Sequence, residues 1–439
     1  MVSRRMFLRG SGVVLGATAL GAASACSGGT GGGDGSDGGG GGGGELRFAW
    51  WGHEEMNRTT NLAIELYNSR QSDVTVLPEN ASWDDFWDRM ATQIAGGNGA
   101  DAFQMSNQMI VDYTQRGALL DWEPYIGDLI DISGYREEMQ SYGVIDGART
   151  GIPISTDGFT VLADLDKLEE LGVGHPEKGW TWEELAEAAL AVHDASGGDI
   201  WGVSDGSGRY EVLEPWVRGR GKTFFNAEAT PVTLGFDKDD LAEFFEYWNN
   251  LRDNGGCLPA DVQAEANTHE TSALVAGTGP FYFTTTSELN GVRALTPARI
   301  QPLPMPDQAG GSKKANFIRP NLFMSAWEGT SQPEEAAKFL DFWINDPEAV
   351  EVIGNSRGVP PNPASAEIVE ETPPEGLRSP SDYLDLIAEI GDPMDRLTPR
   401  SGREVYQLLG RIAEEIRFGQ TNVPDAVESF WSQAESILG

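Results

Sequence analysis

The chain has 439 residues, of which 68 are acidic and 31 basic, so its formal net charge is −37 at pH 7. A surface this acidic repels nucleic-acid phosphates and anionic lipid headgroups, which excludes nucleic-acid binding and requires a covalent anchor for membrane attachment. Four histidines and two cysteines give no metal-ligand spacing, and no cofactor or metal is expected. The length and the 39% hydrophobic content predict a large molecule with a substantial core.

Residues 1–25 are predicted to be a twin-arginine export signal. Ser3-Arg4-Arg5-Met6-Phe7-Leu8 precedes a weakly apolar stretch that is too short to span a membrane. Small residues then lead to Cys26, which predicts a lipidated cysteine, with ordinary signal cleavage as the alternative. Residues 26–45 are a predicted tether, because 13 of the 17 residues at 28–44 are glycine. The expected location is the outer face of the bacterial cytoplasmic membrane, with a lipid anchor.

The body of the chain alternates between strand and helix patterns. Strands are predicted at 46–51, 74–77 and 101–105, each followed by a helical pattern with an apolar face. This order predicts a parallel, doubly wound sheet in the first part of the body. Later extended segments are predicted at 151–154, 160–162, 281–283 and 322–325, and helices at 238–253, 403–417 and 424–438.

Several helix starts carry local signals. Ser82 is a predicted N-cap, and Thr181 with Glu184 forms a predicted capping box. Pro333 and Pro347 are predicted to occupy the first helical position, where a missing N–H costs nothing.

Polar residues follow the first three predicted strands, at 52–55, 79–83 and 106–108. Because ligands bind beyond the carboxyl ends of parallel strands, we expect these loops to meet at one rim. Their hydroxyls, amides, carboxylates and aromatic ring suit a sugar, whose C–H face stacks on an aromatic side chain. No glycine-rich phosphate loop is present, so a nucleotide is not expected. Ordinary turn and capping chemistry is the alternative for each loop.

The tryptophans divide into two groups. The helical period predicts core positions for Trp87 and Trp248. Trp216 and Trp327 lie outside any regular period and are candidates for stacking on a ligand, with core packing as the alternative.

The sequence gives no clear enzyme motif. It contains no His-Glu-x-x-His motif, and its four histidines are scattered, which gives no plausible Ser/His/Asp constellation. Cys257 is predicted to be a small buried filler, not a nucleophile. The paired carboxylates of a glycoside hydrolase stay open as an alternative, because 68 acidic residues always contain candidate pairs.

Several short motifs, taken in order, resemble a known family. They are Trp50-Trp51-Gly52, the stretch 151–173, Thr181-Trp182-Glu183-Glu184-Leu185, the stretches 334–340 and 345–349, and Arg357-Gly358-Val359-Pro360-Pro361-Asn362. In this order they resemble the extracellular sugar-binding lipoproteins of bacterial ABC importers, the maltose-binding-protein family. The resemblance covers nearly all of 46–438.

The resemblance implies an α/β, two-lobed periplasmic-binding-protein fold of type II. Each lobe would be a mainly parallel sheet flanked by helices, with a ligand cleft between the lobes. Lobe 1 would comprise 46–155 and 314–352, and lobe 2 would comprise 156–313 and 353–439 with the C-terminal helices. Chain crossings are expected near 155–157, 304–313 and 352–361, two of which coincide with Pro-rich segments.

A site hypothesis follows from the polar loops and the resemblance together. The predicted ligand-binding residues are Glu54, Asn80, Asn107, Asp157, Glu214, Trp216, Thr285, Arg319, Trp327 and Arg357. Asp157 would accept bonds from sugar hydroxyls, and Arg319 or Arg357 would donate to the ligand or lock the hinge, with structural ion pairs as the alternative. Residues 284–286 lack the Trp that the family often has there, so Trp216 or Trp327 would supply the stacking ring.

The predicted function is that of a non-enzymatic, monomeric substrate-binding protein. It would bind a mono- or oligosaccharide between its lobes, close by hinge bending and deliver the sugar to the permease of an ABC transporter. The alternatives are a lipid-anchored glycoside-acting enzyme and a binding protein for a peptide, polyamine or osmolyte. A sensing role in place of uptake also stays open.

Overall fold

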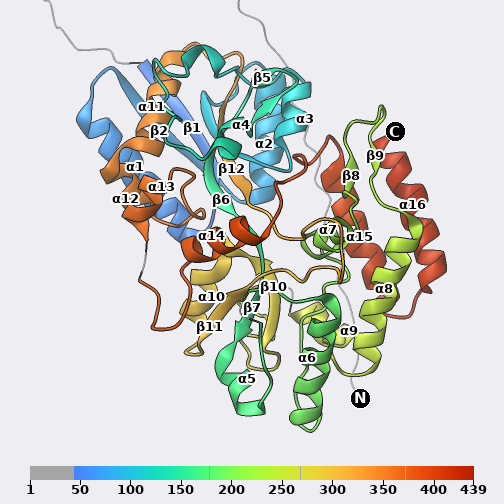
Figure 1. The fold of residues 1–439 in the computed structure, drawn as a ribbon. Helices are drawn as coiled ribbons and strands as arrows, with labels where there is room; N and C mark the ends of the chain where they lie inside the picture. Colours follow the sequence, from blue (N-terminus) through green and yellow to red (C-terminus); the bar gives the residue numbers. More distant parts are fainter. Residues whose placement is uncertain (1–43, 177, 267, 371) are drawn as a thin grey trace, which may run out of the picture. The chain divides into compact units, whose positions relative to one another are not determined.

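The computed structural model describes residues 44–439, apart from 177, 267 and 371. The predicted signal, Cys26 and nearly all of the tether lie outside the described residues and stay predictions. Within the described part of the chain, no helix is long and apolar enough to cross a membrane. The fold is built on two main sheets with helices packed around them (Figure 1).

The larger sheet has five strands in the order β2-β1-β3-β12-β6. These strands are β1 (Gly44–Trp51), β2 (Val74–Ala81), β3 (Ala102–Ser106), β6 (Ile152–Asp157) and β12 (Arg319–Ala326). β1 pairs in parallel with both β2 and β3, which confirms the predicted parallel arrangement of the first three strands. β12 is antiparallel to both β3 and β6 and separates them. The carboxyl ends of β1, β2, β3 and β6 therefore share one edge with the start of β12.

The second main sheet has three strands in the order β10-β7-β11. They are β7 (Phe159–Asp164), β10 (Phe281–Thr285) and β11 (Ile300–Leu303). Both outer strands are antiparallel to β7, so the prediction of a mainly parallel sheet in this lobe is wrong. Apolar periodicity identifies a strand but carries no information about its direction, which the connections set. Short hairpins pair β4 (Val144–Ile145) with β5 (Ala148–Arg149) and β8 (Phe225–Asn226) with β9 (Thr233–Leu234).

Helices flank each sheet. Around the larger sheet lie α1 (Glu54–Arg70), α2 (Trp83–Ala95), α3 (Ile110–Gln115), η1 (Glu123–Tyr125), α4 (Glu137–Ser141), α11 (Pro333–Asn345), α12 (Pro347–Ile353) and α13 (Pro363–Val369). With the smaller sheet lie α5 (Leu165–Leu171), α6 (Trp182–Ala195), α7 (Tyr210–Gly219), α8 (Lys238–Asp253), α9 (Ala260–Glu265), η2 (Thr286–Glu288), α10 (Leu289–Leu295), α15 (Gly402–Arg417) and α16 (Val423–Leu438). We call these two assemblies the first and second lobes. α14 (Pro380–Ile390) contacts β11 and η2, and its Tyr383 and Leu384 pack into the core of the first lobe.

The helix-start signals in the sequence are confirmed. Ser82 Oγ accepts a hydrogen bond from the Asp85 backbone N–H at the start of α2. Thr181 and Glu184 form a complete capping box at α6. Prolines begin α11 and α12, as predicted.

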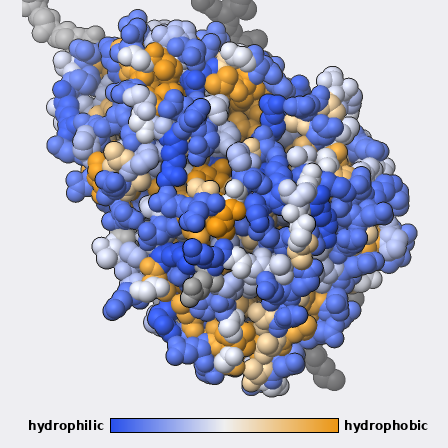
Figure 2. All heavy atoms as spheres, in the orientation of Figure 1, coloured by the Kyte–Doolittle hydropathy of each residue, from blue (hydrophilic) through white to orange (hydrophobic). Residues whose placement is uncertain are grey.

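The apolar cores are separate for the two lobes. The cluster around the larger sheet includes Trp50, Trp122 and Phe339, and the cluster around the smaller sheet includes Trp182 and Trp248. The predicted burial of Trp87 and Trp248 is confirmed, since both side chains are buried. The face drawn in Figure 2 is mostly hydrophilic, with hydrophobic residues in separate patches. The two cores establish the two-lobed α/β fold.

Three chain segments pass between the sheets. Gly158 alone separates β6 from β7. Residues 304–318 connect β11 to β12, and Val359 forms a bridge with Thr156 beside the first crossing. A Cβ at Gly158 would lie 2.3 Å from Ile387 Cδ1, so a larger residue here requires the Ile387 side chain of α14 to move.

Candidate functional site

The edge of the larger sheet where β1, β2, β3 and β6 end faces helices of the second lobe. We call this region the lobe junction and define it by Trp83, Gln108, Asp157, Tyr210, Arg319 and Arg403. Gln108, directly after β3, donates from Nε2 to the Tyr210 hydroxyl on α7, at 3.2 Å. The Arg403 guanidinium carbon on α15 lies 5.5 Å from the ring centroid of Trp83 on α2. The predicted convergence of loops at one edge therefore leads to direct contacts between the lobes.

Asp157 and Arg319 form a buried pair at the first crossing. They pair in the register of β6 and β12, and Arg319 Nη2 lies 3.7 Å from Asp157 Oδ2. The Asp157 carboxylate accepts hydrogen bonds from the backbone N–H groups of Gly158 and Ser287, at 2.9 and 3.1 Å. Burial raises the pKa of Asp157, against the opposing effects of Arg319 and these hydrogen bonds. Asp157 thus ties the turn after β10 to the crossing.

Arg319 reaches from the first sheet into the second lobe. Its guanidinium carbon lies 4.4 Å from the Phe159 ring centroid. Burial alone would lower the pKa of Arg319, but the neighbouring Tyr210 hydroxyl and Asp157 carboxylate raise it. Its Nε is buried without a hydrogen-bond partner among the described residues. Arg319 therefore keeps hydrogen-bonding capacity at the junction.

An aromatic pair continues the junction through the second lobe. The rings of Tyr210 and Tyr406 stack with centroids 4.0 Å apart and an interplanar angle of 16°. Tyr406 lies three residues after Arg403 on α15, so both side chains project from the same side of that helix. Glu214, one turn after Tyr210 on α7, is partly buried, and burial raises its pKa to about 7. Burial therefore favours the protonated form of the Glu214 carboxyl.

Thr285 and its neighbours form the polar rim next to Asp157. Thr285 is half-buried, and its Oγ1 lies 2.9 Å from Ser287 Oγ. His269 pairs with Glu270 and with Glu288, at 2.8 and 3.1 Å. Within the described ranges, no group of three or more His, Cys, Asp or Glu residues is arranged to hold a metal ion.

Two predicted stacking residues lie away from the junction. Trp216 is 4% exposed, and its Nε1 donates to the Asp240 carbonyl at 3.3 Å inside the second-lobe core. Trp327 follows β12, whose end pairs with the start of β3, so Trp327 sits at the opposite edge of the sheet. Both predicted ligand contacts are contradicted by these positions, because neither ring faces the edge where the strands end.

The polar residues predicted in the first lobe all follow strands that end at the same edge of the larger sheet. Asn107 is buried and donates from Nδ2 to the Pro320 carbonyl, so it ties β3 to β12. Asn80 is exposed and lines a surface groove with Asp88 and Arg89 of α2. Glu54 is exposed at the start of α1. Asn107 thus has a structural contact, whereas the side chains of Asn80 and Glu54 are open to solvent.

Arg357 is buried in the first lobe. Its Nε donates to Gln104 Oε1 at 2.8 Å, and its Nη2 donates to Thr60 Oγ1 at 2.5 Å. The guanidinium also lies over the Trp343 ring, with 5.1 Å to the centroid. Burial lowers the pKa of Arg357. These contacts tie the third crossing to the first lobe, so Arg357 has a structural role here.

The sequence hypothesis missed Tyr210, Arg403 and Tyr406. Trp83 and Gln108 lie in the polar loops at 79–83 and 106–108, but neither is among the predicted ligand-binding residues. No local signal marks Arg403, which occupies the first turn of a helix. Its role becomes visible only when α15 is placed against α2.

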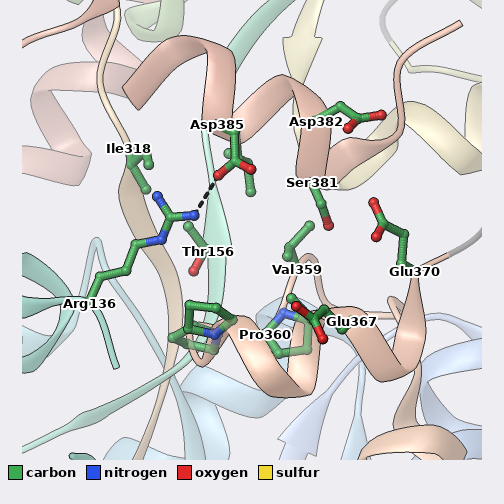
Figure 3. Close-up of a pocket in the computed structure, with 14 residues that line it drawn as sticks. Arg136, Thr156, Ile318, Val359, Pro360, Glu367, Glu370, Ser381, Asp382 and Asp385 are labelled. Carbon is green, nitrogen blue, oxygen red and sulfur yellow. Dashed lines mark hydrogen bonds and ion pairs between the residues drawn. The ribbon is translucent and has the colours of Figure 1, made fainter. Parts of the chain in front are cut away.

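A cavity of about 220 Å³ lies where the three crossings meet. Thr156, Ile318 and Val359 line it, one from each crossing segment (Figure 3). In Figure 3, Arg136 points toward Asp385 of α14, and the two form an ion pair. Because all three crossings line the cavity, a movement of the crossings would change its shape.

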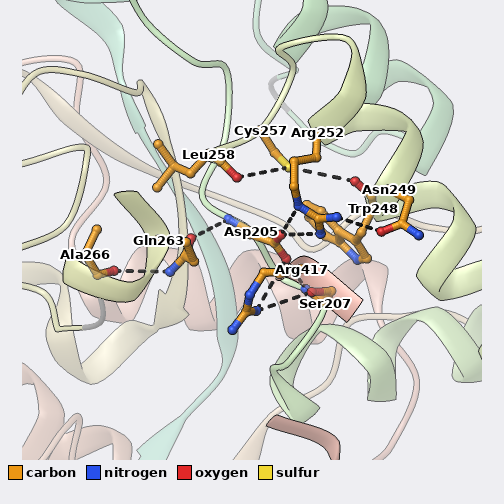
Figure 4. A network of polar contacts seen from close by, with 10 residues as sticks. All are labelled: Asp205, Ser207, Trp248, Asn249, Arg252, Cys257, Leu258, Gln263, Ala266 and Arg417. Atoms are coloured by element: carbon orange, nitrogen blue, oxygen red, sulfur yellow. Dashed lines mark hydrogen bonds and ion pairs between the residues drawn. The ribbon is translucent and has the colours of Figure 1, made fainter. Parts of the chain in front are cut away.

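Cys257 lies in a buried network of the second lobe. Asp205 is fully buried and accepts from Arg252 Nη2 at 2.6 Å, next to Arg417 (Figure 4). Burial raises the pKa of the Cys257 thiol. The predicted role of Cys257 as a buried filler agrees with this setting, since an unionised buried thiol is a poor nucleophile.

A comparison with the profiles of known protein families identifies the family of this chain. The family profile described as bacterial extracellular solute-binding protein matches residues 63–375. The chain belongs to this family. This membership confirms the resemblance seen in the sequence and identifies the chain as an extracellular solute-binding protein.

Individual relatives are more distant. A Brucella abortus (strain 2308) protein, named as a binding protein, is 26% identical over 137 residues, which cover 31% of this chain and 32% of that protein. The chain thus matches about a third of the length of this curated relative.

Solved structures share the fold. A family 1 extracellular solute-binding protein from Alicyclobacillus acidocaldarius is 24% identical, with a TM-score of 0.70, over 90% of this chain and 98% of that one. An oligogalacturonide binding protein from Yersinia enterocolitica, in complex with digalacturonic acid, is 22% identical, with a TM-score of 0.75, over 90% of this chain and 98% of that one. A cyclic α-maltosyl-1,6-maltose binding protein from Arthrobacter globiformis is 19% identical, with a TM-score of 0.69, over 90% of this chain and 99% of that one.

Proposed function

We propose that this solute-binding protein captures a mono- or oligosaccharide at the lobe junction and delivers it to an ABC transporter permease. One observation carries the proposal. Gln108 of the first lobe bonds directly to Tyr210 of the second, beside the partly satisfied Arg319, so polar groups from both lobes meet at the junction. Hydroxyl-rich ligands suit such paired donors and acceptors.

Closure follows from contacts on both lobes. A sugar that bonds to Gln108 and Tyr210 at once favours the arrangement in which the lobes are close. The crossings at Gly158 and at 304–318 would act as the hinge. The closed form then docks on the permease, and a separate subunit hydrolyses ATP.

The choice of a carbohydrate is supported by the names of the structural neighbours. The Yersinia protein binds an oligogalacturonide and the Arthrobacter protein a cyclic maltosyl-maltose. At about a fifth sequence identity, the fold alone is shared, so the sugar itself is part of the proposal.

Several finer features belong to the same proposal. The chain acts as a monomer, has no catalytic activity and is anchored through a lipidated Cys26 after twin-arginine export. Its contact residues are Asp157, Glu214, Thr285 and Arg319 of the original hypothesis, together with the junction residues. The sequence divides the chain into lobe 1 (46–155 and 314–352) and lobe 2 (156–313 and 353–439). Arg357 and α13 pack with the first lobe, however, and α14 lies against both lobes.

A thermal-shift screen of the 44–439 body tests the proposal. Mono-, di- and oligosaccharides are compared with amino acids, peptides, polyamines and osmolytes, and each ligand is recovered and checked for cleavage. A ligand that binds only the folded state raises the melting temperature. We expect a shift with one class of sugar and an intact ligand. A shift confined to non-sugars, or a cleaved glycan, contradicts it.

A further inference from the structure

Several arginine and lysine side chains of this chain lie over aromatic rings, and one of them, Arg403, differs from the others in its partners. Nine such pairs occur among the described residues. Ion pairs with carboxylates hold Arg70, Arg116, Arg209, Arg218, Arg220, Lys238 and Arg319. Arg357 donates instead to Gln104 and Thr60. Among the residues that the structure describes, Arg403 has neither an ion pair nor a side-chain hydrogen bond.

This isolation is unexpected in so acidic a chain. With 68 acidic residues against 31 basic ones, a surface arginine readily finds a carboxylate. The nearby Arg400 does so, reaching Asp112 of the first lobe at 3.3 Å. Arg403 instead lies over Trp83 across the lobe junction.

Helix energetics do not explain the position either. Arg403 is in the first turn of the 16-residue helix α15, where the helix dipole disfavours a cation. The N-cap residue of α15, Ser401, gives no side-chain cap. An arginine at this end of the helix, with neither an ion pair nor a side-chain hydrogen bond among the described residues, keeps its donors for a ligand.

Trp83 is held as a rigid platform. Its ring makes edge contacts with Trp51 and Trp87, with centroids 4.9 and 5.4 Å away. Trp83 is half-buried, and Arg403 lies over its ring. Because the arginine side chain is flexible and unpaired, a flat ligand can displace it without breaking an ion pair.

We infer that Trp83 and Arg403 form a subsite for an acidic sugar residue, a uronic acid. This inference rests on the proposed function of carbohydrate capture. The C–H face of the pyranose ring stacks on Trp83, and the sugar carboxylate pairs with the guanidinium of Arg403. Arginine suits this role because its planar fork matches a carboxylate in two parallel hydrogen bonds.

The negative net charge of the chain does not oppose such a ligand at short range. At physiological ionic strength, exposed charges more than about 8 Å away are largely screened. The ligand carboxylate therefore responds to the nearby groups: Arg403 and the start of α15 attract it, whereas Asp84, Asp85 and Glu404, next to Trp83 and Arg403 in the sequence, repel it. A salt-dependent but persistent affinity is the expected signature.

The test measures binding of matched acidic and neutral disaccharides by titration calorimetry on the 44–439 body. The pairs are digalacturonate with digalactose, cellobiouronate with cellobiose, and dimannuronate with mannobiose. We expect a uronate disaccharide to bind most tightly. Arg403→Gln should weaken that binding about 10-fold or more, while changing any neutral-sugar affinity by less than about 3-fold.

Two further variants separate the platform from the charge. Arg403→Lys keeps the charge but loses the fork, so its loss should be intermediate. Trp83→Phe should weaken uronate binding by about 3- to 10-fold, because a smaller ring gives less stacking. Arg411→Gln, on an exposed turn of the same helix, is the matched control and should leave affinity unchanged.

The outcomes distinguish this subsite from the broader function. Tightest binding of a neutral sugar, or an unchanged uronate affinity in Arg403→Gln, overturns the acidic subsite and leaves carbohydrate capture standing. Absence of binding by every sugar in the thermal-shift screen overturns both. Selective loss of uronate affinity in Arg403→Gln, with the Arg411→Gln control intact, supports both.

Discussion

Asp157 and Arg319 meet at the pairing of β6 with β12, and neither side chain is open to solvent. Removal of the carboxylate leaves a buried guanidinium without its counter-charge, which typically costs 3–5 kcal/mol. We therefore expect Asp157→Ala to lower the free energy of unfolding by about 3 kcal/mol or more, measured by urea denaturation. Asp385→Ala, at an exposed ion pair with Arg136, is the control and should cost less than about 1 kcal/mol. Equal losses in the two variants would contradict the structural role of Asp157.

Glu214 should make stability depend on pH. Burial raises its pKa from 4.5 to about 7, so the folded chain holds this proton more tightly than the unfolded chain. The stabilisation is fully present below about pH 4.5 and is lost as the pH rises through 7, by at most about 3 kcal/mol. Urea denaturation from about pH 5 to 8 should show wild type losing stability relative to Glu214→Gln.

The control for this pH effect is Glu211→Gln on the same helix. Glu211 pairs with Arg209 at 3.6 Å. Its substitution should leave most of the wild-type pH slope in place, because burial, and not the charge of Glu211, is the main cause that raises the pKa of Glu214. A Glu214→Gln variant with an unchanged slope would assign the effect to another group.

Trp216 should matter for folding rather than for stacking on a sugar. Its ring packs against Trp182 and Phe244, with centroids 5.3 and 5.5 Å away. Trp216→Ala should therefore lower the free energy of unfolding by about 3–5 kcal/mol. The milder Trp216→Phe should fold and bind sugar with an affinity close to wild type, measured by calorimetry. A selective loss of affinity in Trp216→Phe, with normal stability, would restore the original stacking hypothesis.

Arg357 should not tolerate lysine. A lysine cannot reach Gln104 and Thr60 together in the planar geometry that the guanidinium provides. Arg357→Lys should cost about 1–3 kcal/mol of unfolding free energy, because a buried polar group loses its partner. Thermal denaturation gives the measurement, and Arg136→Lys at the exposed pair with Asp385 supplies the matched comparison. Indistinguishable melting temperatures for the two variants would refute this account of Arg357.

The sequence predicted local structure where local chemistry decides it. Ser82 and Thr181 begin helices because their oxygens satisfy free N–H groups, a rule that needs no distant contact. Trp248 followed a clear helical period and is buried as predicted. The motifs at 151–173 and 357–362 identified the family, and the fold followed from it.

The candidate site was less predictable, for physical reasons. Pro215 interrupts the period of α7, so the burial of Trp216 on that helix was hidden. The antiparallel direction of β12, which carries Trp327 to the far edge, depends on pairing with strands about 200 residues earlier. Arg403 and Trp83 are 320 positions apart, and only tertiary packing brings them together. A site between two lobes is made of such distant pairs.

The position of β12 has a consequence for synthesis on the ribosome. β6 hydrogen-bonds within its sheet only to β12, because β12 separates it from β3. The nascent chain therefore cannot complete the first sheet until residue 326 has been made, after the entire second sheet. A gene cut at Gly158 would leave both halves with unpaired strand edges. Reporter domains for a sensor built on this chain should therefore be inserted in surface loops, with the polypeptide otherwise continuous.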